Sequence, residues 1–172
     1  MRPSSRQKRE AALRAAERQF LSTGYESVTM DSIAAESEVA KQTLYSYFGS
    51  KRELFLELVS ARTMAATASV LVDAPRIDSD SDPRTVLHDV LCAQLKTVLS
   101  PTLLGLRRLV IGEVPRSPEL AAALYEHGPT KAIAKLAVIL RTFAELGVLR
   151  VTDAERAATQ LNWLVMGEPI NR

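Results

Sequence analysis

Two short amphipathic segments with almost no connection between them restrict the fold more than any other feature. Residues 30–37 and 40–47 both carry apolar side chains at helical spacing, and only Glu38 and Val39 separate them. Two helices joined so closely cannot pack antiparallel, so they must cross at a steep angle. The sequence therefore predicts a helix-turn-helix unit in the N-terminal third of the chain.

The rest of the pattern is also helical. The 172 residues are 47% hydrophobic and 5% aromatic, and no Val/Ile/Thr-rich stretch alternates apolar and polar residues over the length of a strand. We predict an all-α fold, with a three-helix N-terminal head followed by a helical body. The helices are expected at residues 5–22, 30–37, 40–47, 51–72, 84–99, 102–113, 118–127, 130–145 and from 152 or 153 onward.

One clear loop divides the chain. The segment 73–83 contains Pro75 and four aspartates, a composition typical of an irregular connection. We place a head domain at 1–66, with its helix-turn-helix at about 29–48, and a body domain at 67–172. The last apolar helix stops at Arg172 without a capped exit, so we expect a body that is either truncated at its C-terminus or naturally short.

The residues of the head resemble a known family. Residues 29–35 (TMDSIAA) and 39–54 (VAKQTLYSYFGSKREL), preceded by Ala16, Phe20, Gly24 and Tyr25, resemble the DNA-binding domain of the tetracycline-repressor (TetR) family over roughly residues 6–66. The Thr, Ile-Ala, Leu-Tyr, Tyr-Phe and Lys-x-x-Leu elements keep the spacing of that family without insertion. The resemblance implies an operator-binding head, in which Ile33 and Phe48 help to form a small core.

Several residues are expected to contact DNA. Lys41, Gln42 and Thr43 begin the third helix, where side chains reach base edges most easily: Lys to guanine, Gln to adenine, Thr to a base edge or a thymine methyl. The tyrosine hydroxyls, the helix-capping threonine and the lysine that resembles the family's phosphate clamp are expected at the backbone. The predicted DNA-binding set is Thr29, Lys41, Gln42, Thr43, Tyr45, Tyr47 and Lys51.

The N-terminal arm is basic. Residues 1–18 carry six Arg and Lys against two Glu, and Arg6, Lys8 and Arg9 could add salt-sensitive phosphate contacts. Such an arm is more often only a solvated helix face. Equally, Tyr45 and Tyr47 could be core aromatics, and Thr29 could be nothing more than a helix cap.

Three positions depart from the family pattern. Glu38 stands where the turn commonly has Gly, Ala40 where Ser often caps the helix, and Gln42 where Gly is frequent. A positive φ at Glu38 would cost of order 1 kcal/mol, which one residue can tolerate. Gln42 adds a base-reading side chain, so the operator cannot be inferred from relatives.

The body is expected to bind an effector and to form a homodimer, as the resemblance implies. Gln94, Arg107 and Asn162 are candidate effector contacts, and the scarcity of other polar residues favours a largely apolar or aromatic molecule. The apolar face near the C-terminus predicts a dimer interface, although a core role for its tryptophan fits the sequence almost as well. The interface set is Leu161, Trp163, Leu164 and Val165.

Other functional classes find little support. The sequence has no Gly-rich phosphate loop, no Cys/His metal spacing and no nucleophile elbow, so we expect no enzyme, no metal and no cofactor. His88 and His127 are expected to be ordinary histidines. The one cysteine, Cys92, is expected to serve as a small hydrophobe and fits a reducing cytoplasm. No apolar run is long enough to span a bilayer.

These features together predict a cytoplasmic, nucleoid-associated transcriptional repressor. It would be a homodimer bound to double-stranded, palindromic operator DNA and released by a small, largely apolar effector. The alternative is a helical ligand-binding or protein-binding adaptor that keeps the helix-turn-helix shape but does not bind DNA.

Overall fold

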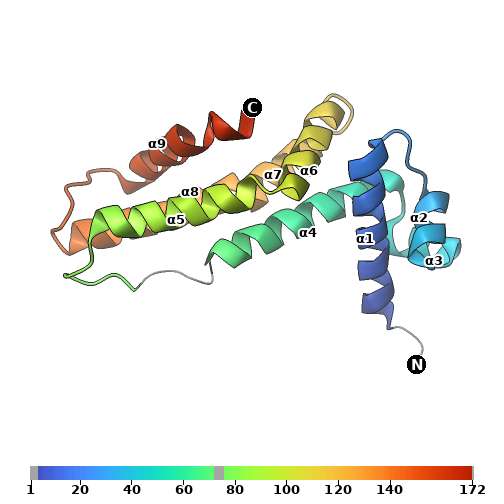
Figure 1. The fold of residues 1–172 in the computed structure, drawn as a ribbon, viewed down its shortest axis with the longest axis horizontal. Helices are drawn as coiled ribbons and strands as arrows, with labels where there is room; N and C mark the ends of the chain where they lie inside the picture. Colours follow the sequence, from blue (N-terminus) through green and yellow to red (C-terminus); the bar gives the residue numbers. More distant parts are fainter. Residues whose placement is uncertain (1–3, 72–75, 172) are drawn as a thin grey trace. The chain divides into compact units, whose positions relative to one another are not determined.

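The computed structural model describes residues 4–71 and 76–171, and within these ranges all regular structure is helical (Figure 1). The predicted all-α fold is confirmed. Most helix ends lie within one or two residues of the expected positions. The elements are α1 Ser5–Thr23, α2 Met30–Ser37, α3 Lys41–Phe48, α4 Lys51–Leu71, α5 Pro83–Val98, α6 Pro101–Glu113, α7 Pro118–His127, α8 Pro129–Glu145, α9 Ala154–Met166 and the short 3-10 helix η1 Pro169–Asn171.

A few sequence expectations fall outside the described residues. These are the basic Arg2, residue 72 of the fourth expected helix, residues 73–75 of the expected loop, and Arg172. The rest of that loop, residues 76–82, is non-helical as expected. Asp82 ends it as the N-cap of α5, where its carboxylate accepts hydrogen bonds from the amides of Arg84 and Thr85.

The chain forms two compact units. Unit 1 contains the residues up to 61 together with 105–123, and unit 2 contains 62–104 together with the residues from 124 onward. The helices α4, α6 and α7 therefore each begin in one unit and end in the other. The functional domain boundary that we expect near residue 66 stays a prediction.

The three helices of the head enclose the predicted small core. Ile33 of α2 and Leu44 of α3 are fully buried, as is Phe20 of α1. Phe20 also packs edge-on against Phe55 of α4, with ring centroids 5.0 Å apart. Burying these side chains stabilises the head by roughly 1.5–3 kcal/mol for each one, so the position of α3 is fixed by its inner face.

Local chemistry sets the turn between α2 and α3. Glu38 ends α2 with φ 54° and ψ 27°, the left-handed conformation that the sequence comparison anticipated. Its amide donates to the carbonyl of Ala34, and Val39, which follows, is buried. Ala40 begins α3 without a side-chain cap. The first amides of α3 are thus left without a side-chain acceptor from the N-cap.

The remainder of unit 1 comes from α6 and α7. Leu106, Val110 and Leu120 of these helices are almost fully buried. A Cβ on Gly105 would lie 2.6 Å from Leu21 Cδ2 of α1, so a larger residue here would require the exposed Leu21 side chain to shift. Two ion pairs join the same segment to the head: Arg52 to Glu119, with 2.6 Å between Nε and Oε1, and Arg116 to Glu26, with 3.1 Å between Nη1 and Oε1.

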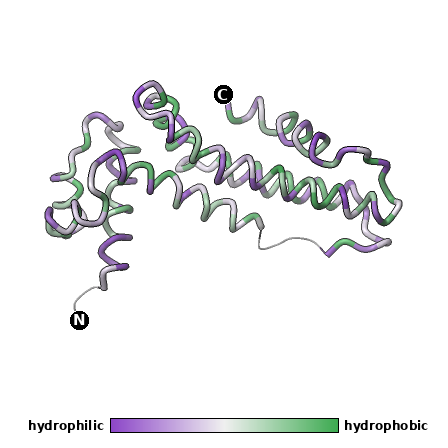
Figure 2. The backbone as a smooth tube through the Cα atoms, turned by 180° about the vertical axis from the view of Figure 1, so that it is seen from behind, coloured by the Kyte–Doolittle hydropathy of each residue, from purple (hydrophilic) through white to green (hydrophobic). Residues whose placement is uncertain are grey.

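Unit 2 is built around the amphipathic helices α5, α8 and α9. Polar and apolar residues alternate along their turns in Figure 2, which matches one buried and one exposed side for each helix. Their inner faces form a single hydrophobic cluster. Its buried members are Val90, Leu91, Leu136, Ala137, Ile139, Leu140, Phe143 and Ala158.

No helix among the described residues is long and apolar enough to cross a membrane.

Candidate functional site

Helix α3 presents a polar outer face. Lys41 and Gln42 in its first turn are exposed, and Tyr45 is 43% exposed, while Leu44 and Phe48 face the core. Thr43 and Tyr47 are half-buried, and the Tyr47 ring lies edge-on to Phe48 at 6.2 Å. The structure thus brings most of the predicted DNA-contacting side chains together on one helix.

Thr29 lies at the neighbouring helix start. It is exposed, and it forms a capping box with Ser32: the Thr29 hydroxyl accepts from the Ser32 amide at 3.0 Å, and the Thr29 amide donates to the Ser32 hydroxyl at 3.2 Å. The amides of Met30 and Asp31, also in this first turn, have no acceptor within the helix. Thr29 is therefore both a cap, as one interpretation expected, and accessible to a ligand.

A side-chain network behind α2 holds this cap in place. The Gln19 amide nitrogen donates to the Ser32 carbonyl at 3.1 Å and to Glu36 at 2.6 Å, and the Ser32 hydroxyl donates to Gln19 Oε1 at 2.6 Å. Hydrogen bonds from Gln19 and then Arg18 lower the pKa of Glu36. Sequence reasoning missed Gln19, because nothing in the local pattern distinguishes it from a solvated helix position.

Lys41 is paired within the head. Its ammonium lies 2.8 Å from Oδ1 and 2.9 Å from Oδ2 of Asp31, in the first turn of α2. The hydrogen bond and the charge of Asp31 raise the pKa of Lys41, so the lysine is firmly cationic. Both side chains are exposed, which leaves the pair open to exchange with a DNA group.

Lys51 is more deeply engaged. Its ammonium donates to the carbonyls of Tyr25 at 3.0 Å, Glu26 at 3.4 Å and Val28 at 3.0 Å, and it lies 4.3 Å from the Tyr25 ring centroid. An ammonium has three N–H donors, and all three have protein acceptors here. A phosphate contact through this ammonium, as the family resemblance implies, would have to replace one of these bonds.

The basic arm is only partly available. Arg9 donates to Glu57 at 2.5 Å, and its guanidinium lies 5.3 Å from the Phe48 ring centroid. Burial raises the pKa of Glu57, although Arg9 acts in the opposite direction. Arg6 is exposed and Lys8 is half-buried near the start of α1. Arg9 therefore contributes to the structure of the head, through its ion pair with Glu57 and its contact with the Phe48 ring.

Two of the three predicted effector residues meet in unit 2. Gln94 of α5 and Asn162 of α9 are both buried, and the Gln94 amide donates to Asn162 Oδ1 at 2.9 Å. Arg107 belongs to unit 1, so the structure does not group it with them. Its Nε is buried and has no hydrogen-bond partner among the described residues.

The four predicted interface residues divide between two faces of α9. Leu161 and Val165 pack against the core of unit 2. Trp163 is 37% exposed and Leu164 is 83% exposed. The face available to a partner is therefore carried by Trp163 and Leu164.

Cys92 differs from its expectation. The thiol is exposed on α5, where it lies 3.6 Å from His88 Nε2 instead of filling a core position. His88 in turn lies 3.1 Å from Asp89 through Nδ1. The described residues contain no group of three or more His, Cys, Asp or Glu side chains arranged to hold a metal.

A three-helix head with an exposed polar recognition helix, joined to further amphipathic helices, defines a helix-turn-helix protein of the regulator type. Comparison with known families agrees with this class. The model described as bacterial regulatory proteins of the tetR family matches residues 12–58, and the model described as the C-terminal domain of AefR-like transcriptional repressors matches residues 85–172. The chain belongs to the TetR family of bacterial transcriptional regulators.

Individual relatives extend the same likeness. A TetR-family regulator from Mesorhizobium loti MAFF303099 superposes with a TM-score of 0.85 at 26% identity, covering 99% of this chain and 84% of that one. The flavonoid-responsive regulator FrrA gives a TM-score of 0.76 at 34% identity, covering 94% and 80%. The regulator YezE of Bacillus subtilis strain 168 is 25% identical over 101 residues, 57% of this chain. The chain spans about half the length of YezE, at 50%.

Proposed function

We propose that this chain is a DNA-binding repressor whose head reads an operator through the first turn of α3. The observation that carries the proposal is the division of α3 into two faces. Leu44 and Phe48 anchor it in the core, while Lys41 and Gln42 point their polar ends to solvent. A helix anchored in this way can enter a major groove without disturbing the head.

The neighbouring elements supply the backbone contacts. Thr29 and the free amides at the start of α2 suit a phosphate, and Tyr45 and Tyr47 carry hydroxyls that can donate to phosphate oxygen. Thr43 would contact a base edge or a thymine methyl. Lys51, at the start of α4, already donates to three backbone carbonyls, so we assign it to the stability of the head instead of to phosphate binding. This division separates residues that position the head from residues that read sequence.

The repressor would act as a homodimer on a palindromic operator. Two copies related by a two-fold axis place two recognition helices on successive major grooves, so the half-sites are expected about one helical turn apart. Trp163 and Leu164 are the side chains that we propose at the interface. As a regulator of operator DNA, the protein would work in the cytoplasm, close to the nucleoid.

A small, largely apolar effector would release the DNA. FrrA, which shares this fold, is by name a flavonoid-responsive regulator. For this chain we retain Gln94 and Asn162 as proposed contacts, reached by a molecule that replaces their mutual hydrogen bond. Arg107 lies in unit 1 and is not assigned to this contact set.

Effector binding in the body would be coupled to the head by two routes along the chain. Helix α4 runs directly out of the head, as the sequence suggested. In addition, the ion pairs Arg52–Glu119 and Glu26–Arg116 tie α6 and α7 to the head within unit 1. A shift of α4, α6 or α7 would alter the spacing of the two heads in the dimer. The free energy that couples effector binding to DNA binding in such a switch is typically about 1–3 kcal/mol.

The proposal is tested by selecting bound sequences from a random duplex pool with the purified protein. A recurrent palindrome is expected, followed by a footprint that disappears when an effector is added. A variant with alanine at Lys41, Gln42 and Thr43 should lose the enrichment, whereas K131A, exposed on α8, should keep it. Failure to enrich any sequence at low salt would contradict the proposal, and a salt-insensitive interaction with a protein would favour the adaptor.

A further inference from the structure

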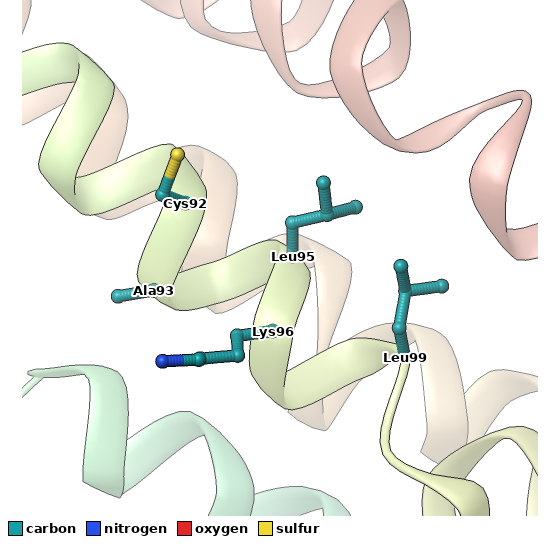
Figure 3. A pocket seen from close by; sticks show the side chains of 5 residues that line it. All are labelled: Cys92, Ala93, Leu95, Lys96 and Leu99. Carbon is teal, nitrogen blue, oxygen red and sulfur yellow. The ribbon is translucent and has the colours of Figure 1, made fainter.

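The outer face of α5 contains an open hollow of about 490 Å³, a size that suits a small organic ligand. Four of the five lining side chains belong to α5 and the fifth, Leu99, is its C-cap residue, as Figure 3 shows. Cys92, Leu95 and Leu99 recur at intervals of three and four residues, so they form one stripe. The lining consists of Cys92, Ala93, Leu95, Lys96 and Leu99.

This hollow is separate from the polar pair that the sequence singled out. Gln94 points to the opposite side of α5, where it meets Asn162 in the interior. Neither residue lines the hollow. A ligand on the outer face therefore leaves the hydrogen bond between Gln94 and Asn162 intact.

Lys96 supplies the only charge in the lining. Its side chain is exposed, and among residues 4–71 and 76–171 it has no ion-pair partner. The nearest acidic side chain along α5 is Asp89, which interacts with His88, two turns away. An unpaired ammonium beside an apolar stripe is complementary to an anionic group on an apolar body.

We propose that the hollow on α5 binds a small apolar molecule that carries a single carboxylate. The apolar part lies on Leu95 and Leu99, and the carboxylate accepts from Lys96. A cationic ligand is repelled by Lys96, and a neutral one of the same shape gains only the apolar contact. The site rests on the proposed function in one respect: its occupant is a second effector, distinct from the one proposed at Gln94 and Asn162, and it also releases DNA.

Cys92 provides a direct readout of occupancy, because it is the one cysteine of the chain and lies in the hollow. The rate of its alkylation by N-ethylmaleimide, followed by intact-protein mass spectrometry, reports whether the hollow is covered. The probes are decanoate, decanol and decyltrimethylammonium, which share one chain length and differ in charge. Each is used below the concentration at which it forms micelles.

In the wild-type protein, decanoate should protect Cys92 at about tenfold lower concentration than decanol, the factor expected for one charge-assisted hydrogen bond. The cationic probe should protect least. In K96M, decanoate should lose its advantage over decanol, and in K96E the order of the two charged probes should reverse. K131M, which removes a lysine elsewhere on unit 2, should behave as the wild type.

Equal protection by decanoate and decanol in the wild type would overturn the proposed anion specificity. No protection by any probe would overturn the site itself. Operator affinity is measured in parallel by fluorescence anisotropy. Charge-dependent protection with unchanged operator affinity supports the site and overturns its role as an effector site. Charge-dependent protection in a protein that binds no DNA leaves the site standing while the proposed repressor function fails.

Discussion

The ammonium of Lys41 and the carboxylate of Asp31 form an exposed ion pair, 2.8 Å from Nζ to Oδ1, at the surface that we propose for DNA. The pair joins the first turn of α2 to the first turn of α3. In the proposed binding mode, the pair would hold the lysine beside the end of the helix that enters the groove, and it would place a negative charge where phosphates approach. We therefore expect Asp31 to oppose binding to arbitrary DNA until Lys41 leaves it for a base or a phosphate.

The substitution D31N should release Lys41 and remove the local repulsion. We expect binding to random duplexes to tighten several-fold, with a smaller gain for the selected operator, so the specificity ratio falls. Fluorescence anisotropy with both duplexes over a range of salt concentrations measures this ratio. Asp153, which caps α9 in unit 2, offers a comparison, since D153N should leave the ratio unchanged. An unaltered ratio in D31N would show that the pair has no part in selectivity.

Gln42 is exposed next to Lys41, and its side chain does not pack in the core. The substitution Q42A should change the preference at particular operator bases by roughly 1–3 kcal/mol, because a bidentate contact to adenine would be lost. Binding of a panel of operators, each with one base pair changed, locates the affected position. A uniform loss across the whole panel would assign Gln42 to the backbone instead.

Lys51 should behave differently from a phosphate-binding residue. Its three acceptors are carbonyls of the connection between α1 and α2, so K51M should destabilise the head by about 1–3 kcal/mol. Thermal melting checks this directly. The salt dependence of DNA binding should change little for K51M, whereas K8M in the basic arm should leave stability unchanged and lower the salt slope by about 1. A lowered slope with unchanged stability in K51M would restore the phosphate clamp that the family resemblance implies.

The sequence predicts the helices well because their ends depend on nearby residues. Gly24 ends α1, Thr29 caps α2 and Pro83 begins α5, and each of these signals acts within a few positions of the end it sets. The buried stripe of the head follows equally from periodicity. The sequence also allows a left-handed Glu38, since the family pattern that the head resembles commonly has glycine in this turn.

The pairings that define the site are less accessible to sequence reasoning, because they join residues far apart in the chain. Lys51 reaches carbonyls 23 to 26 residues earlier, and Arg9 reaches Glu57 over 48 residues. Periodicity reports which side of a helix is buried, but not which polar group a long side chain will find. The expectation for Cys92 was wrong for a similar reason, because apolar neighbours in the sequence do not determine on which face of a helix one residue lies.

The network around Glu36 predicts a pH effect. Hydrogen bonds from Gln19 and Arg18 lower its pKa from 4.5 in the folded head. A carboxyl with a lowered folded-state pKa contributes stability that is present above the unfolded-state value and is lost as the pH falls through the folded-state value. The melting temperature of E36Q should therefore lie below that of the wild type at pH 7, and the difference should narrow as the pH falls below 4.5. In E145Q, on α8, no such convergence is expected, and a constant difference in E36Q would contradict the assignment.

Leu164 is the most exposed large apolar side chain of the described residues, at 83%, and with Trp163 it marks the proposed dimer face. In a two-fold interface each substitution occurs twice, so L164E removes two apolar contacts worth roughly 1.5–3 kcal/mol each. The dimer dissociation constant should rise at least about a hundredfold, as sedimentation equilibrium would show. I111E alters another exposed apolar side chain, on α6 in unit 1, and should leave the association unchanged. If L164E remains as dimeric as the wild type while I111E dissociates, the interface lies on unit 1 and Trp163 is a surface residue of unit 2.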